Sequence, residues 1–180
     1  MAYVTNFTKT PLEMLLGLLN NDNNFSLVPA DVAVRNLEVI TQAPSGNDAN
    51  TSIEIDLLTN EVQDDYAKFY YNRIDLTYLF SLIEPSVRQV DVPTDPVTGL
   101  PTDYAVFTAE LLRKFGVAFN PVDFDFTTKY ATTGLEADKA ILVITANDEN
   151  VSYIGSVEVD VLASLATRVA TTQLDGFYAP

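Results

Sequence analysis

Hydrophobic residues recur every three or four positions in two stretches of the chain, a spacing that places them on one face of an α-helix. The first stretch follows Thr10 and Pro11, a capping threonine and a proline suited to the first helical position. Its apolar stripe consists of Leu12, Leu15, Leu16 and Leu19. The second stretch runs from Asp103 to Phe115, and its apolar face consists of Tyr104, Phe107, Leu111 and Phe115. The pattern predicts one amphipathic helix in each half of the chain.

Runs in which every second residue is apolar predict β-strands. The clearest run is 52–58, where Ile53, Ile55 and Leu57 alternate with acidic residues, as in a half-buried antiparallel strand. Asp75 is a candidate cap for a short helix through Ile83. Residues 162–170 fit a helix or a strand equally well. Further strands are expected at 32–39, 66–74, 87–92, 122–126, 141–146 and 151–161.

The order of these elements is repeated along the chain. At an offset of 92 positions (10 to 102), Thr10 aligns with Thr102, Leu19 with Leu111, Pro29 with Pro121 and Asp31 with Asp123. A weaker similarity at an offset of 87 (53 to 140) covers the following strands. An internal similarity at a fixed offset is typical of repeated structural units. The predicted fold is therefore α+β, with two tandem pseudo-repeats, each a helix packed on a small antiparallel sheet.

The expected organisation has three parts. Residues 1–92 form the first helix-plus-sheet repeat, with an N-terminal arm anchored by Tyr3 and Phe7. Residues 93–101, which contain three prolines, form the linker. Residues 102–180 form the second repeat with a C-terminal arm.

Composition restricts the possible functions. The 180 residues include 25 acidic and 10 basic side chains, a net charge of −15, which repels phosphate groups and predicts neither nucleic acid nor an anionic membrane as a partner. Cysteine and histidine are absent, which removes disulfides, thiolate zinc sites and the commonest general base. The sequence contains no run of 18 apolar residues and no signal-peptide pattern, so we expect a soluble product made in a cytoplasm.

Two acidic or amide-rich features are candidates for a site. Asp123 and Asp125 lie two apart on a predicted strand, where paired carboxylates can hold a cation or transfer protons; a solvated strand face is the simpler interpretation. The loops 20–24 and 147–150 resemble calcium loops in composition but lack their spacing, and turn formation explains them. We therefore predict no catalytic residue, no cofactor and no metal ion, and we expect that the protein is not an enzyme.

The most aromatic stretch supplies the candidate interface. Tyr66, Tyr70, Tyr71 and Arg73 combine residue types that protein interfaces favour. A central strand with its aromatic side chains divided between two faces explains them equally well. If Arg73 lies at such an interface, Arg73→Ala is expected to prevent assembly and to leave the isolated fold intact.

Three segments resemble an uncharacterised family of virion structural proteins of large tailed bacteriophages. They are KTPLEMLLGLLNNDN (9–23), NTSIEIDL (50–57) and YYNRIDLTYLF (70–80). The similarity covers residues 8–83, and the string Tyr71–Leu76 is its most specific part. The chain lacks the glycine-rich turn that often precedes that string in the family. The resemblance implies a component of the virion, made in the host cytoplasm, that has other virion proteins as partners and no known catalysis.

Together these features lead to one expected function and one alternative. The expectation is a non-enzymatic structural component of a tailed phage virion (capsid decoration, neck, tail or baseplate) that acts through protein–protein assembly, as a homo-oligomer, by strand edges and terminal arms. The alternative is a carbohydrate- or protein-binding module with an aromatic and acidic surface.

Overall fold

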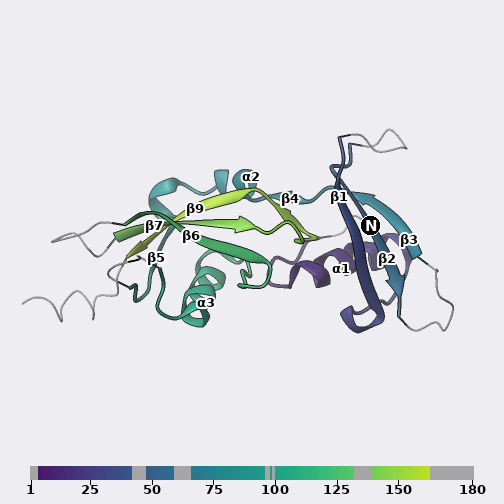
Figure 1. The fold of residues 1–180 in the computed structure, drawn as a ribbon, viewed down its shortest axis with the longest axis horizontal. Helices are drawn as coiled ribbons and strands as arrows, with labels where there is room; N and C mark the ends of the chain where they lie inside the picture. Colours follow the sequence, from purple (N-terminus) through teal and green to yellow (C-terminus); the bar gives the residue numbers. More distant parts are fainter. Residues whose placement is uncertain are drawn as a thin grey trace, which may run out of the picture.

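The computed structural model describes residues 4–41, 48–58, 66–95, 98, 100–131 and 139–162. The fold is α+β. Two lobes lie end to end in an elongated molecule, and each lobe has its own sheet (Figure 1). No helix in these ranges is long and apolar enough to cross a membrane.

The first lobe consists of α1 (Pro11–Asn23), the short 3-10 turn η1 (Pro29–Asp31) and three antiparallel strands, β1 (Val32–Val39), β2 (Thr51–Leu57) and β3 (Tyr66–Tyr71), in the order β1-β2-β3. The predicted cap of α1 is confirmed, because Thr10 and Glu13 form a reciprocal capping box. The helix ends at Asn24, which has a left-handed backbone. Its apolar stripe packs on the sheet, and the buried residues of this core are Leu15, Leu16, Leu19, Val32, Ile53, Ile55 and Val151.

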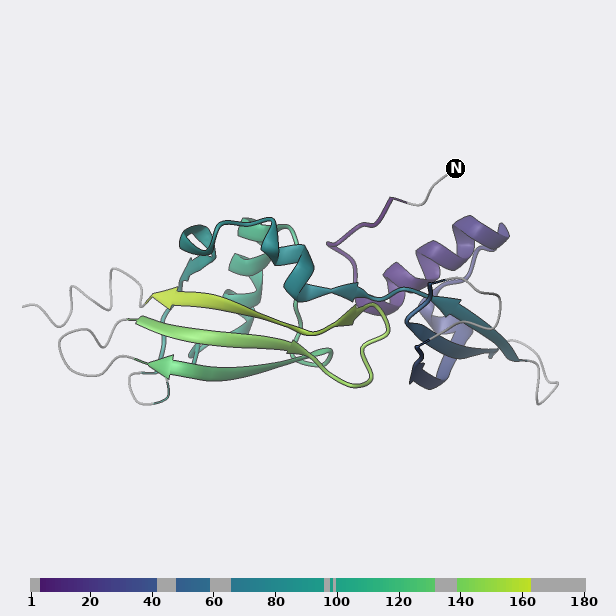
Figure 2. The same ribbon diagram turned by 90° about the horizontal axis from the view of Figure 1, so that it is seen from above.

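The second lobe contains a four-stranded sheet and two helices. The strands are β5 (Gln89–Asp91), β6 (Phe124–Ala131), β7 (Lys139–Ala146) and β9 (Ser156–Leu162), in the order β5-β9-β7-β6. The helices are α2 (Leu76–Ser81) and α3 (Tyr104–Phe115), and both lie on the same side of the sheet (Figure 2). β7 pairs antiparallel with β6 and β9, whereas β5 is parallel to β9, so the expected purely antiparallel sheet is corrected here to a mixed one.

The chain passes from the first lobe to the second directly after β3. After β3 the chain continues through Asn72 and Arg73 into β4 (Ile74–Asp75), which pairs in parallel with β8 (Tyr153–Ile154). The 3-10 turn η2 (Pro85–Val87) then leads to β5. Leu76, Phe80 and Val90 are buried in the core of the second lobe. The change from one core to the other therefore falls near residue 72, ahead of the linker expected at 93–101.

The described part of 93–101 is folded against the second lobe. Thr94 and Pro101 form an isolated antiparallel bridge, and Asp95 N–H donates to Leu100 O at 2.8 Å. Leu100 packs against the large core. Phe7 also packs there, although the N-terminal arm was expected to belong to the first repeat. Tyr3, residues 163–170 and the C-terminal arm lie outside the described residues.

Gly155 connects β8 to β9 where only glycine fits. Its φ is +77°, and a Cβ atom at this position would lie 2.9 Å from Asp75 Oδ1. Asp75 is the N-cap of α2, and its carboxylate accepts a hydrogen bond of 2.8 Å from Thr77 N–H. A side chain at residue 155 would therefore disturb both the turn and the helix cap.

We predict that Gly155→Ala lowers the free energy of unfolding by about 2 kcal/mol, the combined cost of a left-handed alanine and a displaced cap. Gly116→Ala is the matched control, because Gly116 has a φ of +70° and open space around it. The control should lose only about 1 kcal/mol. Urea unfolding of the three proteins measures the difference, and equal losses for both variants would contradict the proposed clash.

Candidate interaction surfaces and the seam between the lobes

Arg73 lies in the seam between the lobes, where its side chain bonds to both of them. The residue is 8% exposed. Its Nε donates to Thr51 Oγ1 in β2, and one terminal nitrogen donates to the carbonyl oxygen of Asn150 in the second lobe, both at 3.0 Å. Its backbone N–H donates to Asn50 Oδ1 at 2.9 Å. The guanidinium therefore cross-links the first sheet to the loop between β7 and β8.

The same loop is attached to β3 and to α1. Tyr71 donates its hydroxyl proton to Val151 O at 2.6 Å, and Ser152 donates its own to Pro11 O at 2.5 Å. The Tyr153 hydroxyl donates to Met14 Sδ at 3.4 Å. Met14 belongs to the core of the second lobe, whereas the leucine stripe of the same helix belongs to the core of the first. The helix thus spans both cores.

Asn150 holds this loop in shape and is fully buried. Its side-chain nitrogen donates to Asp123 O at 2.9 Å, while its side-chain oxygen accepts from the backbone N–H groups of Ser152 and Tyr153 at 3.1 and 2.8 Å. Asn20 binds both backbone groups of Leu27 in the same manner. The turn expected at 147–150 is therefore confirmed, whereas residues 20–23 belong to α1 and only Asn24 takes the left-handed conformation that ends it.

Burial in the seam shifts three ionisation equilibria. It raises the pKa of the Tyr71 hydroxyl well above its usual range, with a smaller opposing effect of Arg73, and burial alone raises the pKa of Tyr153. Burial lowers the pKa of the Arg73 guanidinium, and the nearby Tyr71 and Asp148 oppose that shift. Both tyrosines therefore stay protonated and remain hydrogen-bond donors at neutral pH.

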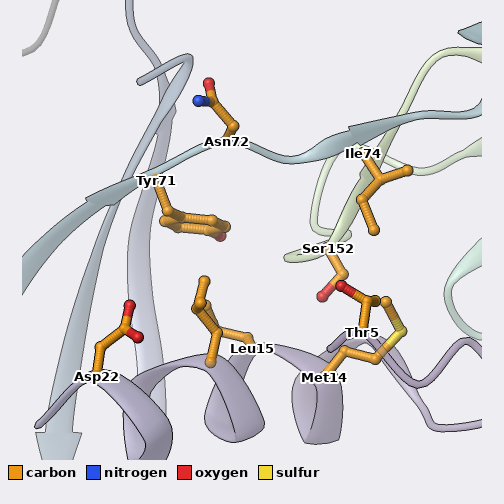
Figure 3. Close-up of a pocket in the computed structure, with 9 residues that line it drawn as sticks. Thr5, Met14, Leu15, Asp22, Tyr71, Asn72, Ile74 and Ser152 are labelled. Carbon is orange, nitrogen blue, oxygen red and sulfur yellow. The ribbon is translucent and has the colours of Figure 1, made fainter. Parts of the chain in front are cut away.

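A pocket of about 270 Å³ opens beside the seam, between α1 and the segment that leaves β3 (Figure 3). Met14, Leu15 and Asp22 line it from the helix side, and Tyr71 and Ile74 face them. The amide of Asn72 points away from the cavity, and its oxygen accepts from Asn50 N–H at 2.9 Å. Asp22 is the one carboxylate in the lining, so this pocket brings together no acid–base pair.

The acidic candidates Asp123 and Asp125 are separated by the structure. Asp123 lies in the turn before β6, where its carboxylate accepts from the Asn120 amide, and it lines a cleft of about 670 Å³ between the lobes. Asp125 lies within β6, is exposed and is not part of the lining of this cleft. Within the described ranges, no group of three or more acidic side chains has the geometry of a metal site.

Of the four aromatic-stretch candidates, Tyr66 and Tyr70 are the accessible pair. They are 50% and 41% exposed and lie on the outer face of β3, on either side of Lys68. The guanidinium of Arg35 stacks over the Tyr66 ring, 4.9 Å from its centroid. Tyr71 and Arg73, by contrast, bind within the chain. Only Tyr66 and Tyr70 remain available to a partner.

An apolar patch at the free end of the first lobe was missed by the sequence interpretation. We call it the tip patch; its exposed members are Phe25, Val28, Leu57, Leu58 and Tyr66. A pocket of about 170 Å³ lies within it, lined by Phe25, Leu27, Ile55, Leu57, Tyr66, Ala67 and Phe69. The sequence contained one signal for this patch. Neighbouring residues of a strand face opposite sides of the sheet, so Leu57 and Leu58 cannot both point into the core.

The fold and these surfaces define a two-lobed α+β protein with an exposed apolar and aromatic patch, a charged cleft and a hydrogen-bond cluster buried in the seam. The chain belongs to the family of unknown function DUF7941, whose model matches residues 5–180. No curated protein and no solved structure matches it.

We predict that Arg73→Ala lowers the free energy of unfolding by about 2–4 kcal/mol, because it leaves the Asn150 carbonyl without its donor in a buried seam and removes the hydrogen bond to the Thr51 hydroxyl. This replaces the expectation that the substitution leaves the fold intact. Arg35→Ala is the control: its ion pair with Asp56 is on the surface and should contribute less than about 1 kcal/mol. Urea unfolding measures both, and equal effects would contradict a special role of Arg73.

A second prediction concerns alkaline pH. The unfolded chain releases its tyrosyl protons near the ordinary pKa of 10.0, whereas folded Tyr71 and Tyr153 retain theirs. The unfolded state then binds fewer protons, so the free energy of unfolding falls as pH rises above 10.0. Tyr71→Phe should reduce the slope of this fall, measured by urea unfolding between pH 9 and 11, and Tyr78→Phe, at a ring that is 71% exposed, should not. Identical slopes for all three proteins would refute this account.

Proposed function

We propose that this protein is a non-enzymatic structural component of a tailed phage virion and acts through protein–protein assembly. The observation that carries the proposal is the tip patch, where five large apolar side chains remain 37–60% exposed and three of them, Phe25, Leu57 and Tyr66, line one groove. Contiguous exposed apolar residues of this kind mark interaction sites. The resemblance of residues 8–83 to virion structural proteins supplies the assignment to a particle.

The resembling segments coincide with the seam between the lobes. Tyr71–Leu76 provides the Tyr71 and Arg73 hydrogen bonds, the parallel strand β4 and the cap of α2. Asn50 and Thr51 accept from Arg73. These residues determine how the two lobes are joined, so the resemblance supports a shared architecture, and the exposed patches supply the contacts of each particular assembly.

The tandem duplication is part of this proposal. Each lobe has a helix packed on a sheet, and the capping residues Thr10 and Asp103 begin α1 and α3 at similar places in the two halves. Duplication followed by divergence accounts for the additional α2 and the parallel strand β5 of the second lobe. The molecule is elongated (Figure 1), and each of its two larger sheets has outer strands, β1 and β3 in one and β5 and β6 in the other, which suits a component that links neighbours.

We predict that replacing Leu58 with serine reduces incorporation into particles severalfold and changes the free energy of unfolding by less than about 0.5 kcal/mol, because Leu58 is 60% exposed. Val122→Ser is the matched control, since Val122 is 83% exposed and lies on the other lobe. Quantitative mass spectrometry of purified particles measures incorporation. The proposed function fails if the wild-type protein is absent from purified particles.

Glycan binding by the purified protein distinguishes the alternative, a carbohydrate-binding module, from the proposed function. Titration calorimetry of the wild-type protein with a panel of glycans should give no heat of binding. Saturable heat that is lost in Tyr70→Ala, together with absence from particles, would favour the alternative.

A further inference from the structure

We infer that β3 is a self-pairing edge, through which two copies of this chain join their first sheets antiparallel about Phe69. The inference rests on the proposed function and names its partner, a second copy. β3 ends the sheet order β1-β2-β3, and its six residues pair with β2 without a register shift. Within the described residues its other side is unpaired, which leaves a regular row of backbone donors and acceptors for another strand.

The other outer strands of the three-stranded and four-stranded sheets are each modified. β1 has a bulge between Arg35 and Glu38, with a left-handed Asn36 (φ 49°). β6 also has a register shift, after Thr128, whose hydroxyl donates to Thr98 O at 2.8 Å. β5 has only three residues, and Lys114 donates to the carbonyl of Gln89 at its start. Bulges, short strands and covering loops are the usual devices against edge pairing, and β3 has none of these three.

Charge favours β3 as the place where two copies meet. Each chain has a net charge of −15, so two copies repel each other over most of their surfaces. No acidic residue occurs between Tyr66 and Ile74, and Lys68 is exposed at the middle of the strand. Lys68 contacts Glu38 at 3.5 Å and Glu54 at 3.9 Å, so carboxylates of its own sheet are already neutralised beside the edge.

Side-chain alternation selects the register. A two-fold axis perpendicular to the sheet places one residue of β3 opposite its own copy and keeps matching faces together. The two registers that pair most of the six residues are centred on Lys68 or on Phe69. Pairing at Lys68 sets two like charges opposite each other, which is unfavourable. Pairing at Phe69 places Lys68 opposite the partner's Tyr70, a favourable cation–π combination that occurs twice.

The apolar side of the strand fits the same register. Phe69 packs against the first core, and Ala67 is exposed beside it in the groove of the tip patch. A partner strand centred on Phe69 brings the partner's Phe69 onto this side and extends the core across the axis. The two sheets become one six-stranded sheet, and the partner's aromatic side chains cover part of the tip patch.

Because the native chain contains no cysteine, engineered thiols test this register directly. Directly opposite residues of antiparallel strands lie about 4.5–5.5 Å apart at Cα, within disulfide range. A mixture of full-length Lys68→Cys and Tyr70→Cys proteins should form a disulfide-linked dimer, and each variant alone should form far less. Thr127→Cys, on exposed β6, is the control for random collision. Linkage of Lys68→Cys with itself, or no linkage in the mixture, would overturn the proposed pairing.

Substitutions of Tyr70 give a second test, because the proposed strand pairing and the net charge of the protein predict opposite changes of the dimer dissociation constant. Tyr70→Lys places a lysine opposite the partner's Lys68 twice and should raise the dimer dissociation constant about tenfold. Tyr70→Glu should leave it unchanged or lower it, although this change adds negative charge to an acidic protein. Sedimentation equilibrium of full-length proteins measures the constants. The reverse order, or a monomeric wild-type protein, rejects the pairing; the particle composition test then still decides the proposed function.

Discussion

The requirement that buried polar groups be hydrogen-bonded governs the place where the two lobes meet. A guanidinium taken out of water is costly unless each donor finds an acceptor. Arg73 meets this requirement with a hydroxyl from one lobe and a carbonyl from the other. The Asn50 side chain accepts a hydrogen bond from the backbone N–H of Arg73. The Asn150 side chain accepts from the backbone N–H groups of Ser152 and Tyr153, after β7. A polar network therefore contributes to fixing the relative position of the sheets.

Helix α1 adds an apolar component to the same junction. Its residue Met14 enters the larger core, and Leu15, Leu16 and Leu19 remain in the smaller one. A short lobe with one helix and three strands buries little apolar surface by itself. Sharing a helix and the Val151 loop with its neighbour compensates for that small core, which explains why the polar seam and the apolar stripe meet at the N-terminal half of α1.

Local patterns in the sequence predicted most of the elements but only part of their assembly. The capping box at Thr10, the alternation at Ile53 and Ile55 and the glycine after α3 depend on neighbouring residues, so they could be read directly. The parallel pairing of β5 with β9 joins residues about seventy positions apart and leaves no local signal. The two alternatives for the stretch with Arg73 stayed open for the same reason: its acceptor, Asn150, is remote in the sequence, and an arginine beside tyrosines is typical both of an interface and of a buried network.

The alternation of side chains along β3 determines which of its aromatic residues are buried and which are accessible to a partner. Alternation along β3 turns Phe69 and Tyr71 toward the helix, and it turns Tyr66 and Tyr70 to the outer face beside Lys68. The strand that connects to the seam through Asn72 and Arg73 is thus also the strand whose other edge is unpaired. In the proposed pairing, a partner binds the strand that carries Tyr71, and only Asn72 and Arg73 separate this strand from β4. The open edge, the seam and the second lobe are therefore consecutive along the chain, which is the arrangement that the proposed pairing uses.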